Sequence, residues 1–406
     1  MSDPTGEAEA QPFANFQYEI YGAGLAGATP KLPIAVNELE AAASERLAPE
    51  AFGYVAGGAG SERTMAANLR AFESWEIVPR MLRDVSARDL STRILGTELA
   101  APVLLAPVGV QSIVHPEAEL ATTRAAAAQG LAAILSTAAS NTIEAVADAA
   151  GASPRWYQLY WPRERELAAS FVGRAQAAGY EAVVVTLDTW ILGWRPRDLQ
   201  NAYLPFLKGE GVANYFSDPV FRAALPGPVE ENFEAAVGQW AYQFSNPAVT
   251  WEDLGWLREQ TDLPIVLKGI LHPDDARRAV QSGVDGVIVS NHGGRQVDGA
   301  VGALDALPWV REAVGREFPV LFDSGIRTGA DVLKALALGA DAVCLGRPYV
   351  WGLGLDGQAG VEHVLRCLLG ELELSLALSG STSVGQLDRS CLVRSPGAGA
   401  PPDIGA

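Results

Sequence analysis

Basic residues are scarce in this sequence. Its 406 residues include 30 Lys and Arg against 48 Asp and Glu, which gives a formal net charge of −18. Nucleic acids and anionic membrane surfaces both attract clustered Lys and Arg, so the composition disfavours either of them as a partner. It also means that an anionic ligand has to be held by local arginines against an unfavourable overall field.

Cysteine is rare as well. The three cysteines, Cys344, Cys367 and Cys391, show neither metal-ligand nor disulfide spacing. We therefore expect no bound metal and a reducing, cytoplasmic environment. Residues 1–20 are acidic and polar and lack a basic region followed by an apolar core, so they predict no signal peptide.

Two further signals are missing. The uncharged stretch 125–143 is interrupted by Gln129-Gly130 and by Ser136-Thr137, which predicts a helix end, a turn and a strand rather than a membrane span. No GxGxxG motif follows a strand in a dinucleotide-binding context, which disfavours NAD as a cofactor.

The apolar residues that are present, 49% of the chain, follow a regular rhythm from residue 102 onward. Short apolar segments that end in polar or glycine residues alternate with helical segments. The expected strands are Val103–Ala106, Ala132–Ser136, Trp156–Tyr160, Ala182–Leu187, Ile265–Lys268, Gly286–Ser290, Val320–Asp323 and Ala342–Gly346. Alternation predicts an α/β fold with a parallel sheet, and eight repeats predict a closed (β/α)8 TIM barrel of about 250 residues.

The remaining residues define the predicted domain organisation. Residues 1–100 are expected to form an N-terminal helical extension packed on the barrel, with helices near 33–47, 49–55 and 61–72, the last capped by Ser61. Residues 101–380 form the barrel, with a long lid insertion after the fourth strand, at 189–250. Residues 381–406 are rich in Ser, Gly and Pro and predict a flexible C-terminal tail. Barrel helices are expected to begin near Pro116, Thr142, Arg163, Trp251, Pro273, Ala303, Thr328 and Gly357.

A barrel places its chemistry at the carboxyl ends of its strands. Polar or ionisable residues recur at that end of consecutive predicted strands: Tyr160 on the third, Thr186 and Asp188 on the fourth, Lys268 on the fifth, Ser290, His292 and Arg295 on the sixth, Asp323 and Arg327 on the seventh, and Gly346 and Arg347 on the eighth. A lone His after a strand is usually structural and a Gly-Gly pair is usually a turn. Six such ends in one register instead favour an active site.

The segment around His292 suggests which chemistry. Histidine can take a proton near neutral pH, and the planar fork of Arg295 suits a carboxylate. Gly293 and Gly294 leave room for a flat ligand near the backbone. Together they predict a base and an anion clamp that act on one small acid.

The last two strand ends predict a phosphate site. Barrels commonly bind phosphate there through backbone amides and a helix N-terminus, and Arg327 and Arg347 would add charge-assisted hydrogen bonds. A phosphate implies a nucleotide-like cofactor or a phosphorylated substrate. Lys268 leaves two alternatives open, because a buried lysine could form a Schiff base, as in an aldolase, or stabilise negative charge on a reduced flavin. A third alternative is a barrel protein that binds a phosphate ester without catalysing a reaction.

Several motifs together resemble one known family. They are Ala106-Pro-Val-Gly109, Gln158-Leu-Tyr160, Thr186-Leu-Asp188-Thr, Leu192-Gly-Trp-Arg195, Leu267-Lys-Gly269, Val289-Ser-Asn-His-Gly-Gly-Arg-Gln-Val-Asp298, Phe322-Asp-Ser-Gly-Ile-Arg327 and Gly346-Arg-Pro348. The sequence is similar, from Tyr54 to Arg347, to the FMN-dependent α-hydroxy-acid-oxidising enzymes. The resemblance implies FMN as cofactor, a small 2-hydroxy acid such as L-lactate and O2 as substrates, and a homotetramer or homo-octamer.

The resemblance also implies roles for individual residues. His292 would be the base, oriented by Asp188, which would favour its protonated form. Arg195, Arg295 and Tyr54 would bind the substrate carboxylate, Tyr160 would bind the substrate oxygen, and Lys268 would stabilise reduced flavin. The flavin ring would contact Pro107, Val108, Gly109, Ser136, Gln158, Thr186 and Ser290, and the ribityl phosphate would contact Asp323, Gly325, Arg327, Gly346 and Arg347.

Three features bear on specificity. Ala138 and Gly109 stand where some relatives carry larger side chains, which predicts a different pocket shape, and Trp190 replaces a proline at the start of the insertion. The insertion is rich in aromatic residues, and segment 200–250 carries two bases and five acids. A net negative charge opposes membrane docking, so we interpret the insertion as a lid and a possible subunit contact. Three outcomes stay open: decarboxylation to acetate, CO2 and water, release of pyruvate and H2O2, or electron transfer to a quinone.

Overall fold

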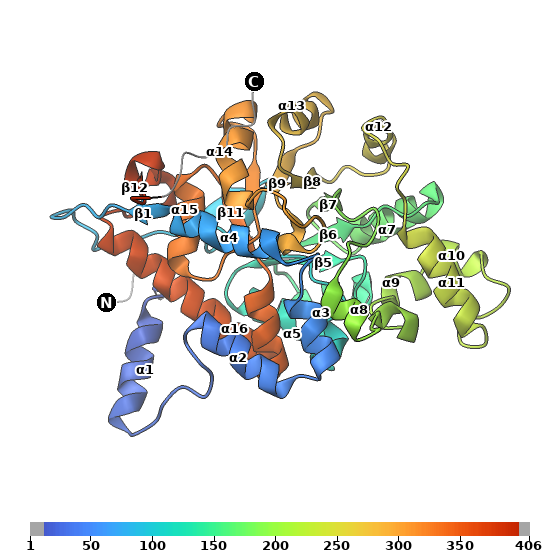
Figure 1. The fold of residues 1–406 in the computed structure, drawn as a ribbon, viewed down its shortest axis with the longest axis horizontal. Coiled ribbons are helices and arrows are strands. Elements are labelled where there is room, and N and C mark those ends of the chain that lie inside the picture. Colours follow the sequence, from blue (N-terminus) through green and yellow to red (C-terminus); the bar gives the residue numbers. More distant parts are fainter. Residues whose placement is uncertain (1–11, 398–406) are drawn as a thin grey trace.

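Eight parallel strands close into a barrel in the computed structural model, which describes residues 12–397 (Figure 1). Around the barrel the strands follow the order β10-β11-β4-β5-β6-β7-β8-β9. Their bounds are β4 Val103–Leu105, β5 Ala132–Ser136, β6 Arg155–Leu159, β7 Val183–Thr186, β8 Ile265–Ile270, β9 Gly286–Val289, β10 Val320–Phe322 and β11 Ala342–Leu345. The predicted (β/α)8 fold is confirmed, because each expected strand overlaps one of these eight.

The barrel interior is filled by side chains from alternate positions of the strands, as in other (β/α)8 barrels. Leu104, Trp156, Ile288 and others form one buried apolar cluster inside the ring. Ile94 and Leu99 join that cluster from a hairpin, β2 (Thr92–Ile94) and β3 (Thr97–Leu99). The indole of Trp156 donates to Thr97 Oγ1 at 2.9 Å. The hairpin therefore closes the amino-terminal end of the barrel, and the prediction of a purely helical extension missed it.

Helices wrap the barrel as expected from the alternating pattern. Their bounds are α5 Ala118–Ala128, α6 Ile143–Ala150, α7 Arg165–Ala177, α12 Asp253–Arg258, α13 Pro273–Gln281, α14 Ala303–Val314, α15 Gly329–Ala337 and α16 Arg347–Leu378. A helix does start near Gly357, as expected, because Asp356 and Gly357 are non-helical and divide α16 in two; the part from Arg347 to Leu355, directly after β11, was not expected. The first part of α16 thus presents its N-terminus to the carboxyl end of β11.

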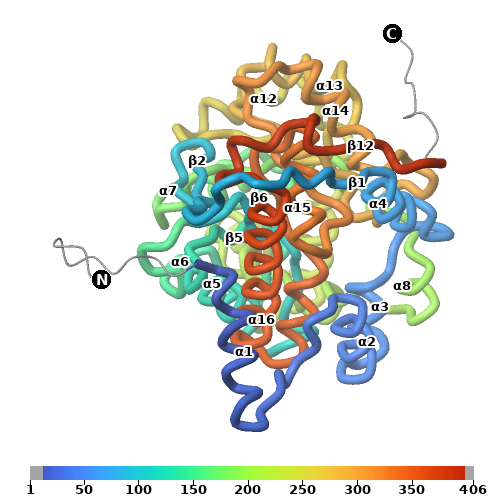
Figure 2. The backbone as a smooth tube through the Cα atoms, turned by 90° about the vertical axis from the view of Figure 1, so that its left-hand side faces the viewer, coloured from blue at the N-terminus to red at the C-terminus, as the bar shows by residue number. Residues whose placement is uncertain are grey.

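The N-terminal segment contributes α1 (Asn15–Leu25), α2 (Val36–Arg46), α3 (Pro49–Ala56) and α4 (Arg63–Glu73). Helix α1 lies alongside α16 in Figure 2. Ser61 was expected to cap α4, but it does not. The carboxylate of Asp298 instead accepts hydrogen bonds from the backbone N–H groups of Ser61, Arg63 and Thr64. A residue distant in the chain thus supplies the cap and ties α4 to the segment after β9.

The C-terminal segment is ordered over the part that the structure describes. Strand β12 (Leu392–Arg394) pairs antiparallel with β1 (Trp75–Ile77), and the two lie side by side in Figure 2. Leu387 and Leu392 are buried. The prediction of a flexible tail from residue 381 is therefore wrong for 381–397, while 398–406, like 1–11, lie outside the described residues. No helix within 12–397 is both long and apolar enough to cross a bilayer.

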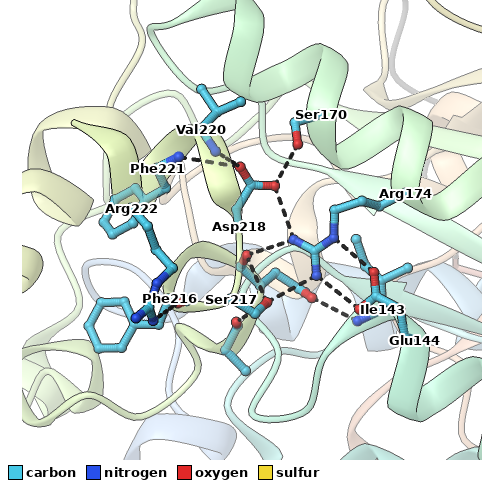
Figure 3. Close-up of polar contacts among 12 residues, drawn as sticks. Ile143, Glu144, Ser170, Arg174, Phe216, Ser217, Asp218, Val220, Phe221 and Arg222 are labelled. Carbon is cyan, nitrogen blue, oxygen red and sulfur yellow. Dashed lines mark hydrogen bonds and ion pairs between the residues drawn. The ribbon is translucent and has the colours of Figure 1, made fainter. Parts of the chain in front are cut away.

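The insertion after β7 folds into short helices beside the barrel: α8 (Pro196–Gln200), η2 (Pro205–Lys208), α9 (Ala213–Phe216), α10 (Pro219–Ala223) and α11 (Phe233–Phe244). Figure 3 shows how it is anchored. The fully buried carboxylate of Asp218 accepts hydrogen bonds from Ser170 Oγ at 2.7 Å and from Arg174 Nη1 at 3.0 Å, both on α7. Arg174 also pairs with Glu144 at 2.8 Å. The insertion is thus fastened to a barrel helix.

Candidate active site

A cavity opens at the carboxyl end of the barrel. Its lining comes from the loops after β4, β5, β6, β9, β10 and β11, from Lys268 on β8, from helices α3 and α16, and from the insertion after β7. The predicted residues among its lining are Tyr54, Pro107, Val108, Gly109, Ser136, Tyr160, Arg195, Lys268, His292, Arg295, Asp323, Gly325, Arg327, Gly346 and Arg347. Gln158, Thr186, Asp188 and Ser290 are not part of that lining. They lie at the carboxyl ends of β6, β7 and β9.

His292 and Asp188 form a pair at one side of this cavity. His292 Nδ1 lies 2.7 Å from Asp188 Oδ1, and the hydroxyl of Thr189 lies within 3.1 Å of both atoms. His292 adopts a positive φ of 59°, a conformation that non-glycine residues rarely take. Its backbone N–H donates to Ser290 Oγ at 3.0 Å. Because Nδ1 is engaged by the carboxylate, Nε2 is the nitrogen that can exchange a proton with a ligand.

Gly269 allows Asp188 to approach this closely. The register of β8 shifts between Lys268 and Ile270, and Gly269 within the bulge has a φ of 108°. A Cβ at position 269 would lie 3.0 Å from the Asp188 side chain. Only glycine therefore fits both the backbone conformation and the space beside the carboxylate.

The charges of this pair follow from burial and neighbours. Burial raises the pKa of Asp188, but the charges of His292 and Lys268 outweigh it and lower the value to about 2. Burial lowers the pKa of His292, and Lys268 and Arg195 add to that effect, so the net shift is downward despite Asp188. The resting pair is thus an ionised carboxylate and a neutral imidazole, while Asp188 by itself raises the pKa of His292 and so favours the protonated form, in the expected direction. Neutral imidazole is the form that can act as a base.

Two arginines lie beside the imidazole without a carboxylate partner among the described residues. Arg195 donates to Arg295 O at 3.1 Å and to Gln296 Oε1 at 2.7 Å. Arg295 donates to the carbonyls of Tyr54 and Gly57, both at 2.6 Å. Burial and the neighbouring charge of Arg195 lower the pKa of Arg295 to about 10. Two like charges held together in this way can bind a carboxylate.

Arg327 and Arg347 also line the cavity, and Arg347 is the first residue of α16. Arg347 donates to three backbone carbonyls, those of Val55, Gly57 and Gly293, each at 3.0 Å. Burial, and to a smaller extent the charges of Arg295 and Arg327, lower the pKa of Arg347 to about 9. Three cationic side chains therefore make this region strongly positive. This cationic helix terminus has the donors that a phosphate requires.

Polar side chains at the carboxyl ends of β6 and β8 supply groups that a flat polar ring can use. Lys268 Nζ lies 3.1 Å from Asp323 Oδ2 and donates to Ser290 Oγ at 2.9 Å. Gln158 is fully buried; its Oε1 accepts from Ser136 Oγ and from Thr137 N, while its Nε2 has no partner among the described residues. An orphan buried amide is costly unless a ligand accepts from it. The edge of an isoalloxazine ring, which carries carbonyl and ring-nitrogen acceptors, fits this donor.

The state of Lys268 argues against a Schiff-base aldolase. Burial would lower the pKa of this ammonium, but Asp323 and Asp188 outweigh burial and raise it. A lysine that attacks a carbonyl needs a depressed pKa and a neutral amine. Lys268 is instead a fixed positive charge beneath the cavity.

Gln296 holds a position that the sequence motif contained but that sequence reasoning did not interpret. Its Nε2 donates to the carbonyls of Asp188 and Ile191, at 2.7 and 3.0 Å. Its Oε1 accepts from Arg195 and from Gly193 N. One amide thus links the Asp188 loop, the start of the insertion and Arg195. Phe206 and Phe244 of the insertion also line the cavity and were not singled out individually.

Comparisons with known proteins agree with this site. Residues 43–394 match the model of the family described as FMN-dependent dehydrogenase. The chain is 46% identical over 90% of its length to an L-lactate oxidase of Lysinibacillus sphaericus, of which 94% is covered, and 42% identical over 90% of its length to 2-hydroxyacid oxidase 1 of Homo sapiens, of which 98% is covered.

A solved structure supports the same conclusion. The crystal structure of mandelate oxidase with (S)-4-hydroxymandelic acid has a TM-score of 0.80 and 41% identity to this chain, and the match covers 89% of this chain and 99% of that one. Sequence identity to these proteins over most of the chain thus agrees with the barrel, the cationic helix terminus and the unpaired amide of Gln158. The chain belongs to the family of FMN-dependent dehydrogenases, flavoenzymes that oxidise 2-hydroxy acids, and FMN is its cofactor.

Proposed function

We propose that this flavoenzyme oxidises L-lactate with O2 and converts it to acetate, CO2 and water, as a lactate 2-monooxygenase does. The segments Glu19-Ile-Tyr-Gly22, Leu204-Pro-Phe-Leu207 and Asp218-Pro-Val-Phe221 resemble that enzyme. The observation that carries the oxidation chemistry is the convergence of a neutral imidazole and two arginines that lack carboxylate partners on one cavity. A 2-hydroxy acid carries the two groups, a carboxylate and an adjacent hydroxyl, that such a set would bind.

Substrate binding would begin with the carboxylate. Arg195 and Arg295 would each donate to it, and a hydrogen bond to a charged group contributes about 1.5–3 kcal/mol. The guanidinium carbon of Arg295 lies 5.1 Å from the ring centroid of Tyr54, so the Tyr54 hydroxyl would join the same clamp. Burial and then the charge of Asp188 raise the pKa of Tyr160 to about 12, so its hydroxyl stays protonated and can donate to the substrate oxygen.

Proton removal would then fall to His292. Its Nε2 would accept a proton from the bound acid, and Asp188, which stays ionised, would stabilise the imidazolium that forms. A positioned base of this kind contributes roughly 10²–10⁴ in rate. Gln158, Lys268, Arg327, Arg347 and the loops after β4 and β10 would hold FMN, which would supply a two-electron acceptor. Lys268 would place a permanent positive charge beside it, and the lid would exclude water.

Decarboxylation depends on retention of the first products. Oxidation of lactate by O2 gives pyruvate and H2O2, and peroxide in turn converts pyruvate to acetate, CO2 and water. The anchoring of the lid by Asp218, Asn214 and Ala213 supports retention. An opening lid would release pyruvate and H2O2, the products of an oxidase, and a quinone in place of O2 would make the protein a dehydrogenase.

Anaerobic titration followed by addition of O2 tests the proposal. L-Lactate is expected to bleach the flavin under anaerobic conditions, and O2 is then expected to yield acetate and CO2 with little free peroxide. Stoichiometric pyruvate and H2O2 would assign the oxidase reaction. Rapid reoxidation by a soluble quinone but not by O2 would assign the dehydrogenase. A flavin that no 2-hydroxy acid reduces would overturn the function itself.

We also propose that the protein is a cytoplasmic homotetramer or homo-octamer. The three free cysteines support a reducing compartment. Several large apolar side chains are exposed, among them Tyr21, Leu25 and Trp194, which supports a subunit contact. Light scattering on the purified holoenzyme measures the oligomeric mass, and a monomer would contradict the proposal.

A further inference from the structure

The insertion contributes two buried aromatic rings to the cavity wall. Phe206 and Phe244 line the same cavity as Gly109 and Ala138. The Phe206 ring stacks on Trp240 with centroids 4.7 Å apart, and the Phe244 ring packs on Tyr160 with centroids 5.1 Å apart. These rings are therefore part of the site rather than a loose cover above it.

The Phe206 ring meets the loop after β5 beside Ala138. A Cβ added at Gly211 would lie 2.7 Å from Val110 Cγ2, 2.9 Å from Ala138 O and 3.0 Å from Phe206 Cε1. A Cβ at Gly109 would lie 2.6 Å from Ala138 O. The backbones of three segments are thus packed against each other here. Gly109, Ala138 and Phe206 thus belong to one continuous stretch of the cavity wall.

Several hydrogen bonds fix this part of the lid to the barrel. Ala213 N donates to Ala139 O at 3.1 Å. The fully buried Asn214 side chain accepts from Ile143 N at 2.9 Å and donates to the carbonyls of Ser136 and Thr137. Glu210 accepts a hydrogen bond from Ser112. Further along, Asp218 joins Arg174 (Figure 3). The segment that follows Phe206 is therefore fastened to the loops after β4 and β5 and to α7.

We propose that Phe206, supported by Phe244, closes the subsite for the substrate's side chain and restricts the enzyme to 2-hydroxy acids with short aliphatic substituents. The inference rests on the proposed function. With the carboxylate at Arg195 and Arg295 and the hydroxyl at His292, the substituent has to face the remaining apolar wall, which Ala138 and the two lid rings provide. The lid rings thus limit the size of the substrate's substituent, because the small side chain of Ala138 does not.

The Phe206→Ala holoenzyme tests this inference. Flavin reduction is measured anaerobically with L-lactate, 2-hydroxybutyrate, 2-hydroxyisocaproate and mandelate. In a hydrophobic pocket one methylene changes discrimination by about 10–200-fold. We therefore expect the ratio of kcat/KM for mandelate to that for lactate to rise at least about tenfold in this variant. Phe206→Leu is expected to raise the ratio for 2-hydroxyisocaproate by a smaller factor.

A matched control comes from the same insertion. Phe233 is 43% exposed and does not line the cavity, so Phe233→Ala is expected to leave every ratio unchanged. An unchanged ratio in Phe206→Ala with FMN bound would overturn the inference. If Phe206→Ala fails to bind FMN, an unchanged ratio in Phe206→Leu would overturn it instead. A wild-type flavin that none of the four acids reduces would overturn the proposed function as well, whereas lactate reduction with constant ratios overturns this inference alone.

Discussion

Replacing Asp188 with Asn removes one negative charge from the site and keeps the shape of the side chain. The carboxylate oxygen lies 2.7 Å from His292 Nδ1, and the two side chains are 14% and 17% exposed. Opposite charges about 4 Å apart attract by about 4 kcal/mol at an effective dielectric constant of about 20. This attraction develops as His292 takes a proton, so losing all of it would slow the step about 10³-fold. Because the charge is only partly formed in the transition state, we expect a reduction of about 10²–10³-fold.

Anaerobic stopped-flow measurement of flavin reduction by L-lactate gives this rate directly. The dissociation constant for lactate is expected to change little, since Arg195 and Arg295 remain. Thr189→Val is the control, because it removes a neutral hydroxyl 2.9 Å from the same carboxylate and is expected to slow reduction less than about tenfold. If Asp188→Asn reduced its flavin within about threefold of the wild-type rate at equal FMN content, the assignment of charge stabilisation to Asp188 would be refuted.

Other predictions follow from the same contacts. Flavin reduction needs neutral His292, whose pKa is lowered from 6.5, so the rate of reduction should rise with pH through that lowered pKa and stay constant at neutral pH. Stopped-flow measurements across pH test this, and a rate that still rises with pH above pH 7 would contradict it. Gln296→Leu should raise the KM for lactate about tenfold or more with a smaller effect on kcat, because Arg195 loses its acceptor at 2.7 Å, while exposed Val297→Ala leaves steady-state kinetics unchanged. Asp218→Ala should lower the free energy of unfolding by about 3 kcal/mol, because the variant leaves Arg174 without one of its two carboxylates; Ser170→Ala should cost about 1 kcal/mol, and urea titrations that give equal losses would argue against a dominant ion pair.

The barrel was predictable because its strands are buried on both faces. Such strands are short continuous apolar runs, and β5 matches its predicted bounds at both ends. The polar residue after each run then follows from the geometry of a parallel barrel. Where the prediction was off by a residue, as at β6, the end of the strand is set by its neighbours: Tyr157 pairs with Val183 across the ladder, and sequence patterns do not contain that pairing.

The errors share one physical cause, which is a partner distant in the chain. Ser61 has the side chain of a helix cap, but Asp298, which is distant in the chain, provides the acceptor. The segment after residue 381 has the composition of a tail, yet β1 offers it an edge to pair with. The motif alone does not indicate a role for Gln296, because its amide contacts the Asp188 loop and Arg195 only in the folded chain. Local patterns carry propensity, while these contacts depend on what the barrel brings together.

The cavity keeps positive charge where stability alone would not place it. Within residues 12–397, Arg195, Arg295, Arg327 and Arg347 form no ion pair with a carboxylate, although the chain holds 48 acids against 30 bases. Burial lowers the pKa of Arg295 to about 10 and that of Arg347 to about 9, which shows that both charges are held at a cost. Backbone carbonyls offset part of that cost. Since the overall charge repels anions, this local excess is what would attract both the substrate carboxylate and the FMN phosphate to the cavity. Neutralising either pair of arginines should therefore stabilise the empty fold while weakening one of the two anion sites.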